Sequence, residues 1–254
     1  KLEVYLVMSD YSGVGKALEV ALEERGVKVI LTGGYTAEVE ERINELDSDG
    51  ETTRVIVHAL SLDHPRADKL DAEALNRAQD TGVRSAHNLV KMITAREWDS
   101  KPKLFFLTRG AMPVVADDQM EGLASSPITG LLRVAVNEFQ DFQWTQIDLD
   151  PNGSEHELQD LADEILMSDR EPEVAFRGDH RYARRVHRIK SEELEPLTKN
   201  AVLEDGDVLP YRLQIDKPGI LTNLSLNLTT RREPDPDEIE IKIDEARNGY
   251  KPVA

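Results

Sequence analysis

Residues 4–26 read VYLVMSDYSGVGKALEVALEERG, and the pattern of apolar residues changes within this short stretch. The first five residues are almost all apolar, as expected for a strand buried on both faces of a sheet. A turn with two glycines follows, and apolar residues then recur at helical spacing until Gly26. The stretch therefore predicts a strand, a turn and a helix, which is the first unit of a parallel α/β sheet.

The same alternation continues to about Phe176 and predicts a series of βα units. Further strands are expected at residues 27–31, 54–60, 104–108, 144–149, 173–176 and 181–187, the last two forming a hairpin. Helices are expected at residues 16–25, 39–46, 72–97, 128–139 and 158–166. Asp71, Ser126 and a Ser154–Glu157 capping box are the predicted helix starts. We expect an α/β fold, a truncated Rossmann-like parallel sheet with helices on both faces.

The composition changes after this array. Residues 190–210 are acidic, weakly periodic and bounded by prolines, which is typical of a linker. Residues 211–215, 224–228 and 239–243 then alternate apolar and polar side chains, which predicts a C-terminal antiparallel β fragment. The expected organisation is a first domain at 1–189, a linker at 190–210 and the first strands of a second domain or a remnant at 211–254. So short a β segment is too small to bury a core alone, so either it packs on the first domain or the sequence stops inside a second one.

Composition excludes several classes of function. The 254 residues carry a formal net charge of −18, which disfavours nucleic acid and anionic membranes as partners. We expect no transmembrane segment, because no apolar run approaches ~20 residues, and the residues from Lys1 onwards do not have the pattern of a signal peptide. The absence of cysteine excludes disulfides and thiolate metal sites and fits a cytoplasmic location.

The turn after the first strand is where a Rossmann domain binds pyrophosphate. Gly13 and Gly15 are the candidate cofactor-binding residues, but Ser9 stands where the early glycine belongs. Asp10 adds a carboxylate near the phosphate position, with nothing nearby expected to compensate. Two alternatives remain open: a working cofactor site, or glycines that only let a helix pack closely on a strand. The second strand ends in Thr32 and two glycines, without the acid that would bind a ribose hydroxyl.

Catalytic motifs are sparse. A short-chain reductase needs a lysine four residues after a tyrosine, and none of the six tyrosines has one. Thr108 stands about where such an enzyme keeps a polarising serine, and a strand-end cap is the competing interpretation. The six histidines show no metal-ligand spacing, so no metal site is expected. The arginines at residues 181–188 predict either an anion site or an edge strand that balances nearby carboxylates.

Several runs resemble one known family. They are YLVMSDYSGVGKALEVALEERGVKVIL, KLFFLTRGA, SPITGLLRVAVNEF, and IDLDP through EVAFRGDHRYARRVHR. Together they resemble the structural, catalytically silent half of a ketoreductase in modular polyketide synthases and animal-type fatty acid synthases. This half is often called a pseudo-ketoreductase. The resemblance runs from about Val4 to Arg188 and implies a region that supports a catalytic sibling and binds no nicotinamide itself.

The C-terminal part resembles the opening of the enoylreductase domain of the same synthases, a GroES-like barrel. YRLQIDKPGILTNLSL and RREPDPDEIEIKI carry this resemblance. In the family the next residues run approximately A-A-x-L-N-Y-K-D-V, and here they are EARNGYKPV. Tyr250 falls on a position that is a proposed proton donor in some members, but Gly249 and Pro252 replace the family's asparagine and aspartate. Either the sequence ends inside such a domain, or a remnant has replaced it.

The leading hypothesis is a structural region without its own cofactor, inside a synthase that uses NADPH and phosphopantetheine on a carrier domain. Its expected partners are the catalytic ketoreductase and other domains of the same chain, and only indirectly a carrier-bound acyl chain. Tyr250 is expected to be inert in this chain. The alternatives are a reductase fragment that binds NADPH through Gly13 and Gly15, and an acidic interaction module that docks a basic partner.

Overall fold

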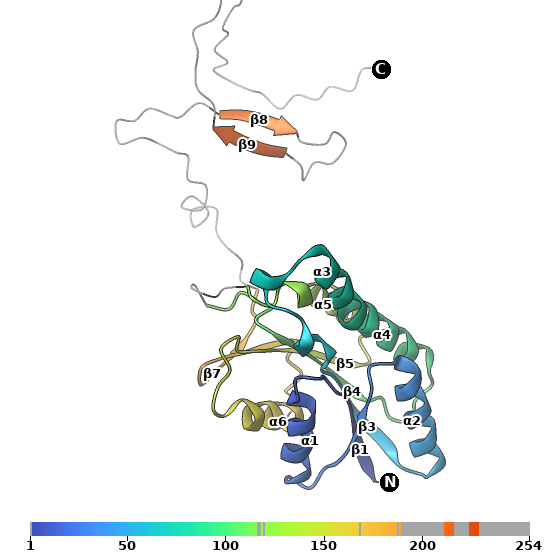
Figure 1. Cartoon of the computed structure of the whole chain (residues 1–254). Coiled ribbons are helices and arrows are strands. Elements are labelled where there is room, and N and C mark those ends of the chain that lie inside the picture. Colours follow the sequence, from blue (N-terminus) through green and yellow to red (C-terminus); the bar gives the residue numbers. More distant parts are fainter. Residues whose placement is uncertain are drawn as a thin grey trace, which may run out of the picture. The chain divides into compact units, whose positions relative to one another are not determined.

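The computed structural model describes residues 2–115, 118, 120–167, 169–186 and 188, and the backbone of two strands at residues 211–215 and 224–228 (Figure 1). Contacts divide the chain into two compact units, residues 1–185 and 186–254. In the described residues, no helix is both long and apolar enough to cross a bilayer.

The first unit is built on one sheet. Its strands are β1 (Glu3–Met8), β2 (Lys28–Thr32), β3 (Thr52–His58), β4 (Lys103–Arg109), β5 (Gln143–Leu149), β6 (Glu173–Arg177) and β7 (His180–Ala183). The spatial order is β2-β1-β3-β4-β5-β6-β7, and every pair is parallel except the β6–β7 hairpin. The predicted α/β class and the closing hairpin are confirmed.

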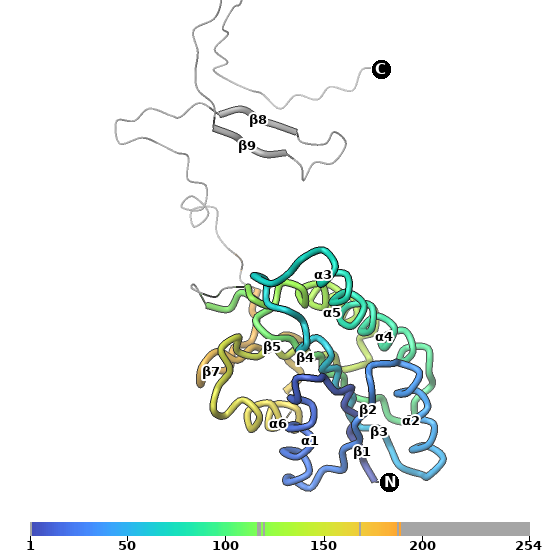
Figure 2. The backbone as a smooth tube through the Cα atoms, in the orientation of Figure 1, coloured from blue at the N-terminus to red at the C-terminus, as the bar shows by residue number. Residues whose placement is uncertain are grey.

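Helices cover both faces of the sheet (Figures 1 and 2). They are α1 (Val14–Glu23), α2 (Thr36–Ser48), α3 (Ala72–Gln79), α4 (Ser85–Ala95), α5 (Pro127–Glu138) and α6 (Glu157–Met167), with short 3₁₀ turns at Leu60–Asp63, Ala67–Lys69 and Leu123–Ser125. Apolar side chains of α2, α4 and α5 form one buried cluster with one sheet face. Those of α1 and α6 form a second cluster with the other face.

The connection through α6 differs from the others. The chain steps from β5 to β6 in the same direction as from β3 to β4, yet α6 packs beside α1 on the opposite face from α4. This crossover therefore has the opposite hand, which is uncommon between parallel strands. Because α6 covers the α1 side, the α5 side of β6 and β7 is left to loops and to the edge of α5.

Three local predictions were wrong. The single helix predicted over residues 72–97 is interrupted by a π turn at Asp80–Arg84 and ends at Ala95, although Asp71 does cap its start. Ser126 does not cap α5, because its hydroxyl donates to the Leu123 carbonyl. The capping box does not form at α6, since the carboxylate of Glu157 binds Arg109.

In the second unit, β8 (Tyr211–Ile215) and β9 (Leu224–Leu228) pair antiparallel, as predicted. The predicted linker, the third strand at residues 239–243 and Tyr250 lie outside the described residues.

Candidate functional site

The loop after β1 is held by hydrogen bonds to a carboxylate of the same loop. Asp10 is almost fully buried and accepts the backbone N–H of Gly15 at 2.6 Å and that of Val14 at 3.1 Å. It also accepts the hydroxyl of Ser12. The expectation that nothing nearby compensates Asp10 was wrong, because the free N–H groups at the start of α1 bind its carboxylate.

A second carboxylate reaches the same loop from the 3₁₀ turn after β3. Asp63 accepts the N–H of Tyr11 at 2.8 Å and the N–H of Ser12 at 2.8 Å. From Tyr11 to Gly15, every backbone N–H other than that of Gly13 is therefore bound to one of the protein's own acids. A pyrophosphate at this place would lose those donors and meet two negative charges.

The two glycines of the loop have separate geometries. Gly13 adopts φ +97°, a left-handed conformation that favours glycine, and precedes the first turn of α1. At Gly15 a Cβ atom would lie 2.7 Å from the Ser9 hydroxyl oxygen and 3.1 Å from the Ser9 Cα atom, so glycine favours this close approach of the helix to the strand end.

A cleft of about 810 Å³ lies beside this loop, where β1, β2 and β3 end. Tyr11 and Tyr35 line it and are highly exposed, and Lys69 adds a cation. The sequence places no acid at the end of β2, but the carboxylate of Glu38 in α2 lies against Gly33, 2.5 Å from where a Cβ would stand. Sequence reasoning missed Glu38 because this acid follows the strand by six residues and reaches back from a helix.

The ends of β4, β5 and β6 are joined by a buried ionic network. Asp148 is fully buried and accepts the Thr108 hydroxyl at 2.7 Å, the N–H of Ala111 at 2.8 Å and a guanidinium N–H of Arg177 at 2.7 Å. Arg177 also binds Asp118 at 2.9 Å. Burial alone would lower the pKa of Arg177, but the two aspartates outweigh it and raise that pKa.

The Thr108 hydroxyl is part of this network. The Thr108 side chain has no solvent exposure, donates to Asp148 and accepts an N–H of Gln146 at 3.1 Å. The hydroxyl thus bonds to two side chains of the neighbouring strand β5, near the end of β4. Neither a tyrosine nor a lysine stands on α5 above it.

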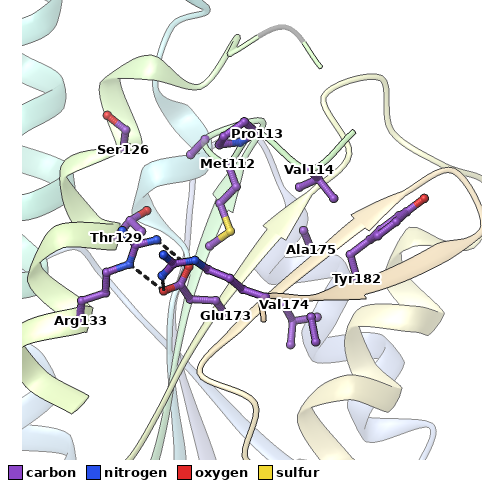
Figure 3. A pocket seen from close by; sticks show the side chains of 13 residues that line it. Met112, Pro113, Val114, Ser126, Thr129, Arg133, Glu173, Val174, Ala175 and Tyr182 are labelled. Atoms are coloured by element: carbon purple, nitrogen blue, oxygen red, sulfur yellow. Dashed lines mark hydrogen bonds and ion pairs between the residues drawn. The ribbon is translucent and has the colours of Figure 1, made fainter. Parts of the chain in front are cut away.

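A groove of about 550 Å³ lies on the α5 side of β6 and β7 (Figure 3). Met112 and Val114 line it from the loop after β4, and Tyr182 lines it from β7. Arg133 grips Glu173 through two bonds of 2.7 and 2.9 Å, and Arg184 binds the same carboxylate at 3.0 Å. Burial would raise the pKa of Glu173, but the two arginines lower it, so this carboxylate is not a free base in the groove.

The remaining candidates have structural partners. His58 is fully buried in β3, stacks on Phe106 and lies 3.2 Å from the Ser85 hydroxyl oxygen. In the described part of the chain, no cluster of side chains has the composition of a metal site. The arginines of the closing hairpin form ion pairs on the edge strand, as one of the two interpretations predicted; these are Arg181 with Glu164, Arg184 with Glu173, and Arg185 with Glu171.

The order of the strands, the cleft where β1, β2 and β3 end and the glycine turn define a Rossmann-type α/β domain. The chain belongs to the family described as the Rossmann fold domain of the polyketide synthase extender module SpnB, whose sequence model matches residues 15–186. It is thus a ketoreductase-like Rossmann domain of the modular polyketide synthase type.

Sequence comparison finds similarity to large polyketide synthases. The chain is 27% identical over 224 residues to a phenolphthiocerol/phthiocerol polyketide synthase of Mycobacterium tuberculosis, covering 81% of this chain and 10% of that protein. It is 32% identical over 142 residues to a phthioceranic/hydroxyphthioceranic acid synthase of Mycobacterium bovis, covering 56% of this chain and 6% of that one. The chain thus spans a tenth or less of the length of these relatives.

Solved structures give the same fold. The first ketoreductase of the tylosin polyketide synthase superposes with a TM-score of 0.54 at 27% identity, covering 75% of this chain and 40% of that one. A C2-type ketoreductase from a modular polyketide synthase superposes with a TM-score of 0.57 at 20% identity, covering 75% and 42%. The second likeness concerns the fold alone.

Proposed function

We propose that this chain is a non-catalytic structural region of a multidomain polyketide or fatty acid synthase, a pseudo-ketoreductase that supports a catalytic ketoreductase. One observation carries the proposal: Asp10 and Asp63 occupy the N–H donors with which the loop after β1 would bind a pyrophosphate. A domain that fills its own phosphate site with carboxylates disfavours a dinucleotide there.

The catalytic side of the domain supports the same proposal. The helix that would carry a tyrosine and a lysine has neither, and the Thr108 hydroxyl is committed to Asp148 and Gln146. The usual groups that deliver a proton to a carbonyl oxygen are therefore missing from α5 and from the end of β4. The domain does offer a seven-stranded sheet with a groove on the α5 side of β6 and β7.

In this proposal residues 1–189 are the structural ketoreductase half, residues 190–210 a linker, and residues 211–254 the start or remnant of an enoylreductase-like domain. The parent uses NADPH and a carrier-bound phosphopantetheine arm elsewhere in the chain. The similarity to a polyketide synthase ketoreductase and to large polyketide synthases supports this context. Gly13 and Gly15 are then vestigial, and Tyr250 is inert.

The second candidate is a reductase fragment with its own NADPH site. The carboxylate of Glu38 beside Gly33 favours it, because an acid at the end of β2 is what binds a ribose hydroxyl. The cleft of about 810 Å³ between Tyr11 and Tyr35 is also large enough for part of a dinucleotide.

Titration of the whole chain with NADPH, followed by nicotinamide fluorescence, separates the two candidates. We expect no saturable binding below about 1 mM. Saturable binding tighter than about 100 µM, roughly 5.5 kcal/mol, would overturn the structural proposal. Glu38→Gln is the matched variant, because it keeps the shape of the side chain and removes the charge that a ribose would need.

A second experiment tests the supporting role directly. The chain is mixed with the separately expressed catalytic ketoreductase of the same synthase, and the melting temperature of the ketoreductase is followed. Binding to its native state should raise that temperature in a concentration-dependent way. An unchanged melting temperature at a large excess of this chain would contradict the proposal.

A further inference from the structure

The opposite edge of the sheet, where β3, β4 and β5 begin, carries a concentration of positive charge. A hollow of about 420 Å³ lies there, lined by four cationic side chains and one carboxylate. The cations are Arg54, Lys101, Lys103 and Arg170, and the carboxylate is Asp141. This excess stands out on a chain whose formal net charge is −18.

The fold brings these residues together from distant parts of the sequence. Arg54 lies near the start of β3, Lys103 is the first residue of β4, and Arg170 lies in the loop that leads into β6. Lys103 stands beside Val55 in the β3–β4 register and beside Gln143 in the β4–β5 register. Two members of the cluster, Arg54 and Lys103, therefore lie on neighbouring strands of the sheet, and Arg170 joins them from a loop.

The protein's own acids neutralise only part of the cluster. Lys101 pairs with Asp141, and Arg54 lies 3.7 Å from Glu3. Among the residues that the structure describes, Lys103 and Arg170 have no carboxylate within ion-pair distance. Burial first, and then the charges of Arg54 and Arg170, lower the pKa of Lys103.

The backbone at Arg170 is also unusual. Its φ of +67° is left-handed, and among the described residues it is the one case outside glycine. Glycine adopts this conformation without strain and an arginine does not. The chain therefore holds a guanidinium at this hollow where glycine would be the sterically favoured residue, and an observed strain of this kind points to function.

A purely structural explanation is the carboxyl end of α5, whose residue Val136 lines the hollow together with Gln140 just beyond the helix. Helix carboxyl ends attract cations and bind them through their free carbonyl groups. Within the described chain, however, no hydrogen bond joins Arg54, Lys103 or Arg170 to a helix carbonyl. The end of α5 does not account for the cluster.

We propose that this hollow binds the phosphate group of a phosphomonoester, held by Lys103, Arg170 and Arg54. A phosphate monoester carries a charge near −2 at neutral pH and three acceptor oxygens, which match these three cations that line the hollow. A single carboxylate would leave the excess charge uncompensated. Pro102, Val136 and Phe142 add apolar lining, so an ester with a small apolar group fits better than inorganic phosphate.

The experiment titrates the whole chain with phenyl phosphate, inorganic phosphate and benzoate at constant ionic strength, followed by ¹⁵N chemical shifts. We expect saturable binding of phenyl phosphate, weaker binding of inorganic phosphate, and binding of benzoate at least about tenfold weaker than phenyl phosphate. The amides that shift should be those around residues 54, 103 and 170. Inorganic phosphate as the tighter ligand would overturn the choice of an ester and identify free phosphate as the source of the group.

Three variants locate the site. Lys103→Met and Arg170→Gly should each weaken phenyl phosphate binding by about tenfold, because each removes one charged donor. Arg77→Met is the matched control, since it removes an exposed cation at the cleft of the opposite edge and should leave the affinity unchanged. Arg170→Gly suits the left-handed backbone, so folding is preserved even where Lys103→Met is not tolerated.

Two results would overturn the proposal. One is the absence of saturable binding by any phosphate ligand up to about 10 mM, which corresponds to roughly 2.7 kcal/mol. The other is binding that Arg77→Met weakens while Arg170→Gly and Lys103→Met leave it intact, because the anion would then lie in the carboxyl-edge cleft. The proposed structural function is independent of both outcomes.

Discussion

The charged groups are paired differently at the two ends of the parallel strands, which we call the carboxyl edge and the amino edge of the sheet. At the carboxyl edge, where Rossmann domains bind their cofactor, the donors of the loop after β1 are filled by Asp10 and Asp63. At the amino edge, where β3, β4 and β5 begin and where this fold is not expected to bind ligands, Lys103 and Arg170 form no ion pair with a carboxylate of the described residues. The N–H groups at the conventional site are bound to the chain's own carboxylates, and the hollow at the other edge is the site for which we propose an anion.

This contrast shows why the fold alone does not give the function. A parallel sheet presents helix N-termini at one edge and helix C-termini at the other, and this polarity makes the carboxyl edge the default anion site. Here individual side chains override that default at both edges. Substitutions can test each edge, and the largest effect is expected where a buried charge loses its partner.

Removing Arg177 tests how firmly the carboxyl edge is closed. Arg177→Met should lower the free energy of unfolding by about 3–5 kcal/mol, because it leaves the fully buried Asp148 without its charge partner. Urea unfolding followed by tryptophan fluorescence measures the loss. Arg185→Met is the control, since its exposed pair with Glu171 is worth at most about 1 kcal/mol. Equal losses in the two variants would refute this account of the network.

The second largest effect is expected from mild acid, which should lower the free energy of unfolding through His58 at the carboxyl edge. Burial lowers the pKa of His58 to about 4, so the folded state keeps this ring neutral while the unfolded chain binds a proton below about 6.5. The unfolded state therefore binds more protons between these values, and stability falls as the pH falls through that window. The loss should reach roughly 3 kcal/mol at pH 4 for this residue.

His64 follows the same sign, because burial lowers its pKa to about 4 as well. Urea midpoints measured at pH 7, 6 and 5 give the slope, and His58→Phe should reduce it to the part that His64 contributes. His87→Gln on the exposed face of α4 is the control that should keep the slope. A slope that His58→Phe leaves unchanged would assign the acid sensitivity to other groups.

Removing the carboxylate of Asp10 from the loop after β1 should have a smaller effect on stability. Asp10→Ala frees the N–H groups of Val14 and Gly15 and should cost about 1–2 kcal/mol, as loss of a helix cap does. The variant should also gain phosphate-dependent shifts of the Gly15 amide that the parent chain lacks. Asp71→Ala removes a comparable cap from α3 and should give a similar cost without any gain in phosphate binding. No gain in Asp10→Ala would mean that Asp10 does not close the site.

The sequence predicts the fold better than it predicts either edge. The apolar runs of β1 and β4, the hairpin at β6 and β7, and the Asp71 cap depend on residues close in the chain, and all of them are confirmed. Periodicity does not reveal on which face α6 packs, because its amphipathic pattern is the same on either side. The π turn was missed for a similar reason: Gly82 lies against the ring of His64, which comes from a distant loop.

The pairing of charges at the two edges could not be predicted from the sequence, because it depends on residues that are distant in the chain and meet only in the fold. Asp63 reaches the loop after β1 from more than fifty positions away, and Arg177 reaches Asp148 from a neighbouring strand. Asp10 alone is local to the loop that it binds, because it accepts the N–H groups of Val14 and Gly15 four and five residues later. The hollow at the amino edge was not foreseen at all, because Arg54, Lys103 and Arg170 share no motif and meet only in the folded sheet.

The smallest expected effect isolates the backbone strain at the amino edge. Arg170→Gly and Arg170→Ala both remove the charge that repels Lys103, but only glycine also relieves the left-handed φ of +67°. The glycine variant should therefore be more stable than the alanine variant by about 1 kcal/mol, the size of the left-handed penalty. The glycine variant should also be at least as stable as the parent chain, which is unusual for a substitution by glycine. Urea midpoints of the three chains measure the differences. An alanine variant as stable as the glycine variant would show that the backbone at Arg170 is not strained. The left-handed conformation would then give no argument for a function of Arg170.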